Sequence, residues 1–198
     1  MNKSMLAFSA IGLLLSFALP AEAQDRLVPK PDSLIGELNP DAPAGTAQYG
    51  FLIGDWEVDV TLIRPGQEPL LYTANWHNHW IANGYVVMQE WHGPYGTGIE
   101  LRSYDERLDL WHGRNLYVPS PGTWYENTAR MSGSDMVVTT HRSDPQAGDS
   151  ITREIYFDIS ESGFRIRTEL SRDGGATWAE GRYSAHCRRV ETRPAAAP

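Results

Sequence analysis

Apolar and polar side chains alternate in short runs along most of this chain, and the first clear run follows residue 50. Trp56 and Val58 fall on one side of an extended backbone, while Glu57 and Asp59 fall on the other. A period of two residues is typical of a β-strand that is buried on one face and wet on the other. No segment sustains the period of 3.6 residues that an amphipathic helix requires. The pattern therefore predicts an all-β domain.

Ten such runs follow one another at intervals of about ten to thirteen residues, separated by turn-forming dipeptides such as Asn83-Gly84 and Gly174-Gly175. The predicted strands are 51–63, 69–81, 85–92, 98–105, 108–118, 123–131, 135–142, 150–158, 163–170 and 176–190. Short connections pair consecutive strands antiparallel, as a meander. Because a flat sheet of ten strands would leave exposed edges, we expect a single closed antiparallel β-barrel.

The two ends of the sequence differ from this pattern. Residues 1–23 contain Lys3, an apolar run and Ala21-Glu22-Ala23, which together predict a cleaved signal peptide and a periplasmic or secreted protein without a membrane anchor. Residues 24–48 are rich in Pro, Asp and Gly and predict an extended arm. The barrel domain is expected over 49–191, with a disordered tail over 192–198.

Charge and cysteine content narrow the picture further. The formal net charge is −8 and there is no block of Lys or Arg, which argues against nucleic acid as a partner. Cys187 is the only cysteine, so no disulfide can form within the chain. The fold must therefore rest on packing and hydrogen bonds.

Several short motifs resemble the calycin-like barrels, a group that includes lipocalins and nitrobindins, and most of all the uncharacterised DUF1579 family. The motifs are Gly54-Asp55-Trp56, the run from Trp76 to Gly84, Gln89-Glu90-Trp91, Ser103-Tyr104-Asp105, Leu110-Trp111 and Cys187-Arg188-Arg189. The resemblance spans residues 51–190 and implies the lipocalin-like barrel fold. It also implies that an arginine of the last strand packs over Trp56 and closes the barrel. We assign that role to Arg188, with Arg189 as the alternative, and count Gly54 among the structural residues.

The hairpin around Asn83-Gly84 carries the candidate chemistry. Asn-Gly favours a type I′ turn, which sets His77 opposite Glu90 and His79 opposite Met88. One interpretation is an acid–base pair of His77 and Glu90, or a metal site of His77, His79 and Glu90. The other is that this face is solvated and the neighbouring Trp face fills the lumen. We favour the second, because Trp prefers the buried side.

With the Trp face inward, the lumen is expected to be lined by Trp76, Trp80, Val87 and Trp91. The leading hypothesis is then an exported protein that binds a small apolar molecule inside the barrel, without a cofactor. The alternatives are a barrel enzyme that uses the His77, His79 and Glu90 site, and an accessory protein with a solid barrel whose surface binds an unknown protein partner.

Two further motifs are given structural interpretations. The run from Ser171 to Trp178 matches an Asp-box, but a single copy predicts only the turn between the last two strands. His186 lies on the last strand, where nitrobindins place a haem-binding histidine, yet a single strand histidine is more often a packing or surface residue.

Overall fold

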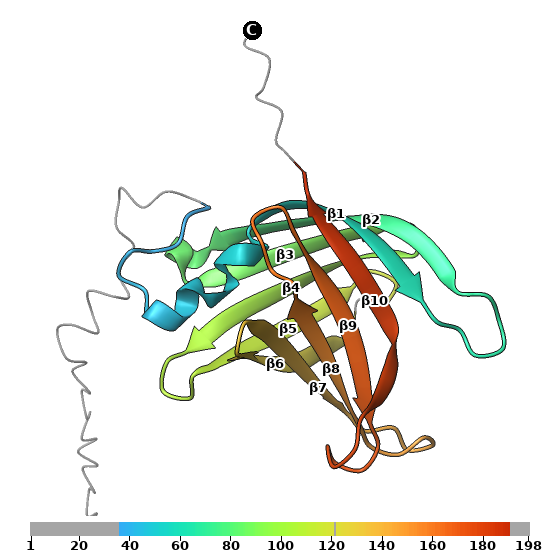
Figure 1. Cartoon of the computed structure of the whole chain (residues 1–198). Coiled ribbons are helices and arrows are strands. Elements are labelled where there is room, and N and C mark those ends of the chain that lie inside the picture. Colours follow the sequence, from blue (N-terminus) through green and yellow to red (C-terminus); the bar gives the residue numbers. More distant parts are fainter. Residues whose placement is uncertain (1–35, 121, 191–198) are drawn as a thin grey trace, which may run out of the picture.

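A computed structural model describes residues 36–120 and 122–190, and these form a closed antiparallel barrel of ten strands (Figure 1). The strands are β1 (Gly54–Leu62), β2 (Leu70–Ile81), β3 (Val86–Gly93), β4 (Gly96–Asp105), β5 (Leu110–Tyr117), β6 (Trp124–Ser132), β7 (Asp135–Arg142), β8 (Ser150–Phe157), β9 (Gly163–Ser171) and β10 (Ala179–Arg189). Every strand pairs with its neighbours in sequence, and β1 pairs with β10 to close the cylinder. The predicted fold class and the ten predicted strands are confirmed.

Alternation of side chains explains the strands. In β1 the side chains of Trp56, Val58 and Val60 are buried inside the barrel, whereas those between them face outward. The same alternation in β9 buries Phe164 and Ile166. A one-residue slip would turn each apolar set toward water, so the pattern itself fixes the register.

The turn between β2 and β3 is a single 3-10 turn, η2 (Ala82–Gly84), and it keeps the predicted register. Asn83 and Gly84 both have positive φ, at 57° and 80°, which Asn and Gly tolerate better than other residues. Ile81 then pairs with Val86, and His77 lies opposite Glu90 as the sequence predicts. This register places Trp76 beside Trp91 on the inner face.

A 3-10 helix, η1 (Ala44–Leu52), covers one end of the barrel (Figure 1). The sequence predicts an arm up to residue 48 and a strand from residue 51, so this helix corrects both boundaries. Packing against the end of the barrel explains the helix, because Tyr49 and Leu52 are fully buried and the Gln48 side chain faces Trp111. The Trp111 Nε1–H donates to Gln48 Oε1 at 3.0 Å, and the Trp56 Nε1–H donates to the Leu52 carbonyl at 2.7 Å.

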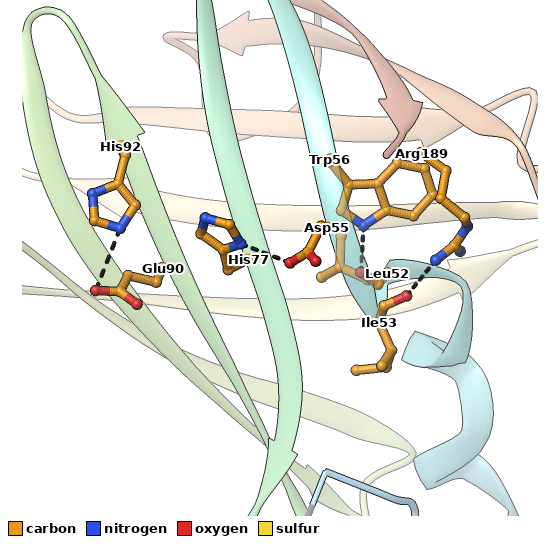
Figure 2. Close-up of polar contacts among 8 residues, drawn as sticks. All are labelled: Leu52, Ile53, Asp55, Trp56, His77, Glu90, His92 and Arg189. Carbon is orange, nitrogen blue, oxygen red and sulfur yellow. Dashed lines mark hydrogen bonds and ion pairs between the residues drawn. The ribbon is translucent and has the colours of Figure 1, made fainter. Parts of the chain in front are cut away.

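The arginine over Trp56 is Arg189, and the assignment of Arg188 to this role is therefore wrong. The Arg189 guanidinium lies 4.2 Å from the Trp56 ring centroid and donates to the carbonyls of Ile53, Phe51 and Glu161 (Figure 2 shows the contact with Ile53). Arg189 pairs with Trp56 across the β1–β10 closure, whereas its neighbour points outward.

Two neighbouring residues explain how Arg189 reaches this position. Gly54 has a φ of 123°, and a Cβ on it would overlap the Arg189 guanidinium, so the glycine before Trp56 makes room for the arginine. Arg188 instead forms ion pairs with Glu57 and Asp59 on the outer surface and thereby lowers the pKa of Asp59.

The run from Ser171 to Trp178 forms the β9–β10 turn, as predicted. Asp173 accepts hydrogen bonds from the backbone and the hydroxyl of Thr177, and these contacts lower the pKa of its carboxyl group. Trp178 donates to the Gly175 carbonyl, and Arg153 stacks on its ring at 3.6 Å. The motif therefore stabilises the turn of the β9–β10 hairpin.

The predicted signal peptide, the first part of the predicted arm and the predicted tail lie outside the described residues. Within the described ranges, neither helix has the length and apolar character needed to cross a membrane.

Candidate functional site

The barrel encloses a cavity of about 300 Å³ that lies in the half of the cylinder away from η1. Its walls carry aromatic and polar side chains from the inner face. They are Tyr72, Trp76, Gln89, Trp91, Tyr95, Glu100, Arg102, Asn115, Tyr117, Asn127, Val138, Thr140, Glu154, Tyr156, Ile166 and Tyr183, with Gly93 and Gly96. Cavities of this size hold small organic ligands in other proteins.

The position of these residues along their strands shows where the cavity opens. Tyr72 lies near the start of β2, Tyr95 in the β3–β4 turn and Tyr117 at the end of β5, all at the end opposite η1. Tyr95 and Tyr117 are exposed, and the rings of Tyr72 and Tyr95 meet edge to face with centroids 5.2 Å apart. Aromatic rings therefore surround the mouth.

Arg102 forms the floor of the cavity. Its side chain is only 2% exposed, its Nη1 donates to Gln89 Oε1 at 2.5 Å, and its Nη2 donates to Glu100 Oε2 at 2.9 Å. The Tyr49 ring of η1 lies beneath the guanidinium at 5.0 Å. The helix that closes the barrel therefore also supports the charged floor.

Glu100 continues this network toward β6. Its Oε1 accepts a hydrogen bond of 2.6 Å from the Asn127 side-chain amide. The residue between them in the barrel wall is Gly113, which pairs with both Arg102 and Asn127. A Cβ on Gly113 would overlap the Asn127 oxygen, so this glycine leaves the space that the polar network occupies.

A second carboxylate, Glu154, faces the cavity from β8. Burial raises its pKa from the ordinary 4.5 to about 7, and the negative charge of Glu100 adds to this effect. Arg102 and a hydrogen bond from Tyr156 act in the opposite direction. Glu154 therefore gains and loses its proton near neutral pH.

Several polar atoms of the wall have no hydrogen-bond partner among the described residues. They are the Oδ1 atoms of Asn115 and Asn127, the Arg102 Nε and the Trp76 Nε1. Buried polar atoms usually have a partner, since an unsatisfied one costs about 1–3 kcal/mol. Four of the seven unpartnered buried atoms in the described part of the chain thus lie around this cavity, and the other three, the Tyr49 hydroxyl and both amide atoms of Asn78, lie toward η1.

The lining residues predicted from the sequence divide into two groups. Trp76 and Trp91 line the cavity and meet edge to face with ring centroids 5.8 Å apart. Trp80 and Val87 are buried in the core but do not border the cavity. The cavity is also more polar than the predicted apolar lumen, because Glu100, Arg102 and Glu154 line it. These three residues are not among those predicted from the sequence.

The candidate site of His77, His79 and Glu90 lies on the outer face of the barrel. His77 and Glu90 are opposite each other in register, yet each contacts another partner (Figure 2). His77 Nδ1 lies 2.6 Å from Asp55 Oδ1, and the Glu90 carboxylate lies 3.4 Å from His92 Nε2. Within the described ranges, no three His, Cys, Asp or Glu side chains are arranged as a metal site. The geometry therefore gives two surface pairs, His77 with Asp55 and His92 with Glu90, whose histidine rings meet edge to face with centroids 5.7 Å apart.

The last strand places its two candidates on opposite faces. His186 is exposed on the outer face, opposite Asp59, and does not border the cavity. Cys187 is fully buried, and burial raises the pKa of its thiol to about 12, which keeps it protonated and unreactive at neutral pH.

Two solved structures are similar to this chain. A protein of unknown function from the DUF3598 family of Nostoc punctiforme PCC 73102 has a TM-score of 0.48 and 14% identity, over 76% of this chain and 53% of that protein. Rv2717c from M. tuberculosis has a TM-score of 0.49 and 11% identity, over 76% of this chain and 100% of that protein. This chain thus spans about half the length of the first.

No family model and no curated protein matches the chain. The resemblance to DUF1579 therefore stays a prediction.

Proposed function

We propose that this barrel binds a small organic molecule in the cavity, with a polar end on the floor and a flatter, less polar part between the rings of the mouth. The observation that carries the proposal is a cavity of about 300 Å³ whose wall combines charged side chains with four unpartnered polar atoms. A protein evolved only for stability would fill such a space with apolar side chains. The polar wall is consistent with a ligand that supplies the missing partners.

The cavity is also prepared for binding before any ligand arrives. The Arg102 guanidinium is held by Gln89, Glu100 and the Tyr49 ring, so its position does not depend on a ligand. A fixed polar floor reduces the entropy lost on binding. This arrangement refines the expectation of a small apolar ligand to one with a polar end.

The proposal is tested by blocking the cavity with one substitution and comparing it with its neighbour. Thr140 lines the cavity, whereas Thr139 lies on the opposite face of the same strand. A library of small aromatic and polar compounds is screened against the wild type by thermal shift and by quenching of Trp fluorescence, since Trp76 and Trp91 lie in the wall. We expect compounds that bind the wild type and T139F but not T140F.

Two results would contradict this proposal. One is a library in which no compound stabilises or quenches the wild type. The other is a compound that binds T140F as tightly as the wild type, because that ligand would sit elsewhere.

A further inference from the structure

The wall of the cavity carries more acidic than basic side chains. Glu100 and Arg102 form an ion pair of 2.9 Å on the floor, and the other arginine Nη donates to Gln89. The third charged side chain of the wall is Glu154. When Glu154 is ionised, the cavity holds two carboxylates and one guanidinium, so one negative charge is left over.

No residue within 36–120 or 122–190 forms an ion pair with Glu154. It accepts a hydrogen bond from the hydroxyl of Tyr156, which also lies 3.5 Å from Arg102 Nη2. The positive charges that act on Glu154 are those of Arg102 and of Arg142 on β7, which is itself exposed and stacked on Tyr125. Even a partly buried carboxylate without its own cation is costly unless a ligand provides one.

The remaining wall favours the same kind of ligand. Asn127 is 92% buried, and its amide nitrogen donates to Glu100, so the unpartnered Oδ1 is an acceptor. The rings of Tyr72, Trp91 and Tyr117 line the path from the mouth. Aromatic faces attract cations, and carbonyl oxygens accept the hydrogen bonds of ammonium groups.

Resting on the proposed function, we propose that the ligand is a small organic cation, an amine or quaternary ammonium compound, whose charge is held by Glu154 and whose body lies against the aromatic rings. An anionic ligand is disfavoured, because the only guanidinium of the wall is already paired and two carboxylates face the same space. A neutral ligand would leave Glu154 uncompensated.

Three probes of the same shape and number of non-hydrogen atoms test the charge. They are benzyltrimethylammonium, the neutral alcohol 2-methyl-1-phenylpropan-2-ol, and phenylmethanesulfonate. Each is titrated into the full chain by calorimetry and Trp fluorescence. We expect the cation to bind at least about tenfold more tightly than the alcohol, and the sulfonate most weakly.

The substitution E154Q keeps the shape of the side chain and removes its charge. It should abolish the preference for the cation while leaving the alcohol unaffected. E126Q is the matched control, because Glu126 lies on the outer face of β6 and pairs with Arg114. The control should bind all three probes as the wild type does.

The pH dependence is a second readout that needs no variant. Benzyltrimethylammonium does not titrate, and Glu154 must be ionised to attract it. With the Glu154 pKa near 7, cation binding should strengthen between about pH 6 and about pH 8 and stay flat in E154Q. The neighbouring Tyr117 does not titrate in this range, because its pKa is raised to about 12.

The outcomes separate the two proposals. If the alcohol binds as tightly as the cation and E154Q changes neither, the cavity binds small molecules but the cation proposal is wrong. Preferential binding of the sulfonate would also overturn it. If none of the probes binds and the wider library fails as well, both proposals fall.

Discussion

The two ends of this barrel are built from similar aromatic side chains, but they differ in that the open end lines a cavity with charged groups. At the end covered by η1, the indole N–H groups of Trp56 and Trp111 each find an acceptor on the helix. The Arg189 guanidinium donates to three backbone carbonyls and covers the Trp56 ring. Aromatic packing and these hydrogen bonds make this end a stable lid, although the Tyr49 hydroxyl and the Asn78 amide have no partner among the described residues.

At the open end, the polar groups are only partly satisfied. Arg102 is well held, yet its Nε, the Trp76 Nε1 and the Asn127 Oδ1 have no partner among the described residues. Glu154 is partly buried and has no ion pair within the described ranges. The comparison indicates that the closed end contributes stability, whereas the open end places charged and unpartnered groups around a cavity, as binding sites do.

The largest expected effect is at the closed end. Trp56→Ala removes an indole that is 1% exposed, its hydrogen bond to Leu52 and the ring beneath Arg189. Loss of a large buried aromatic side chain typically costs about 3–5 kcal/mol. Denaturant unfolding followed by circular dichroism measures the free energy of unfolding.

Trp124→Ala is the control for this prediction, because Trp124 is 49% exposed at the start of β6. It should change the free energy of unfolding by less than about 1 kcal/mol. If Trp56→Ala and Trp124→Ala lowered the free energy of unfolding equally, the closed end would not be a special source of stability.

The difference between the two ends was only partly predictable from the sequence. Alternation along β1 and β9, and the turn at Asn83-Gly84, were sufficient for the strands, their order and the β2–β3 register. These features are local, because the period of two residues and the turn type depend on neighbouring residues only. The inner position of Trp76 followed from the same parity.

The charged floor was missed because its local pattern points the other way. In β4, the charged residues Glu100 and Arg102 alternate with the apolar residues Ile99 and Leu101. Such a pattern ordinarily turns the apolar side chains inward. Here the charged side chains face inward instead, where they form an ion pair with each other. The register carries the necessary information: Gln89 pairs with Glu100, so the inward face of β3 continues onto the charged face of β4. Extending the β2–β3 register to β4 therefore predicts that Glu100 and Arg102 face the interior.

Other features depend on contacts between distant parts of the chain. The choice between Arg188 and Arg189 is a matter of one residue in the β1–β10 pairing, and no local pattern distinguishes two consecutive arginines. The η1 helix was missed because its burial depends on a barrel end that exists only after closure.

A smaller effect is expected at the open end and depends on pH. Because the folded-state pKa of Glu154 is raised from 4.5 to about 7, the folded protein holds this proton more tightly than the unfolded chain. The associated stability is fully present below about pH 4.5 and is lost as the pH rises through about 7. The free energy of unfolding of the wild type should therefore fall by roughly 1–3 kcal/mol relative to E154Q across this window.

Denaturant unfolding of both proteins at a series of pH values measures this difference. Subtracting the E154Q curve removes the titration of all other groups that the two proteins share. If the free energies of unfolding of the two proteins depend on pH in the same way, Glu154 titrates as an exposed carboxyl group. The two ends of the barrel would then not differ in their electrostatics.

The smallest expected effect compares two neighbouring arginines of β10. Arg189→Gln removes the donors to the Ile53, Phe51 and Glu161 carbonyls and the cover of the Trp56 ring, and should cost about 1–2 kcal/mol.

Arg188→Gln provides the matched comparison, since it removes only half-exposed surface ion pairs and should cost less than about 1 kcal/mol. Salt sharpens the comparison, because exposed ion pairs between charged groups are screened, whereas hydrogen bonds to neutral, mostly part-buried backbone carbonyls are affected much less. In about 1 M NaCl the cost of Arg188→Gln should therefore shrink toward zero, while that of Arg189→Gln persists. If instead Arg188→Gln is the costlier of the two at every salt concentration, the barrel closes through its outer ion pairs and the lid at the η1 end is not the source of its stability.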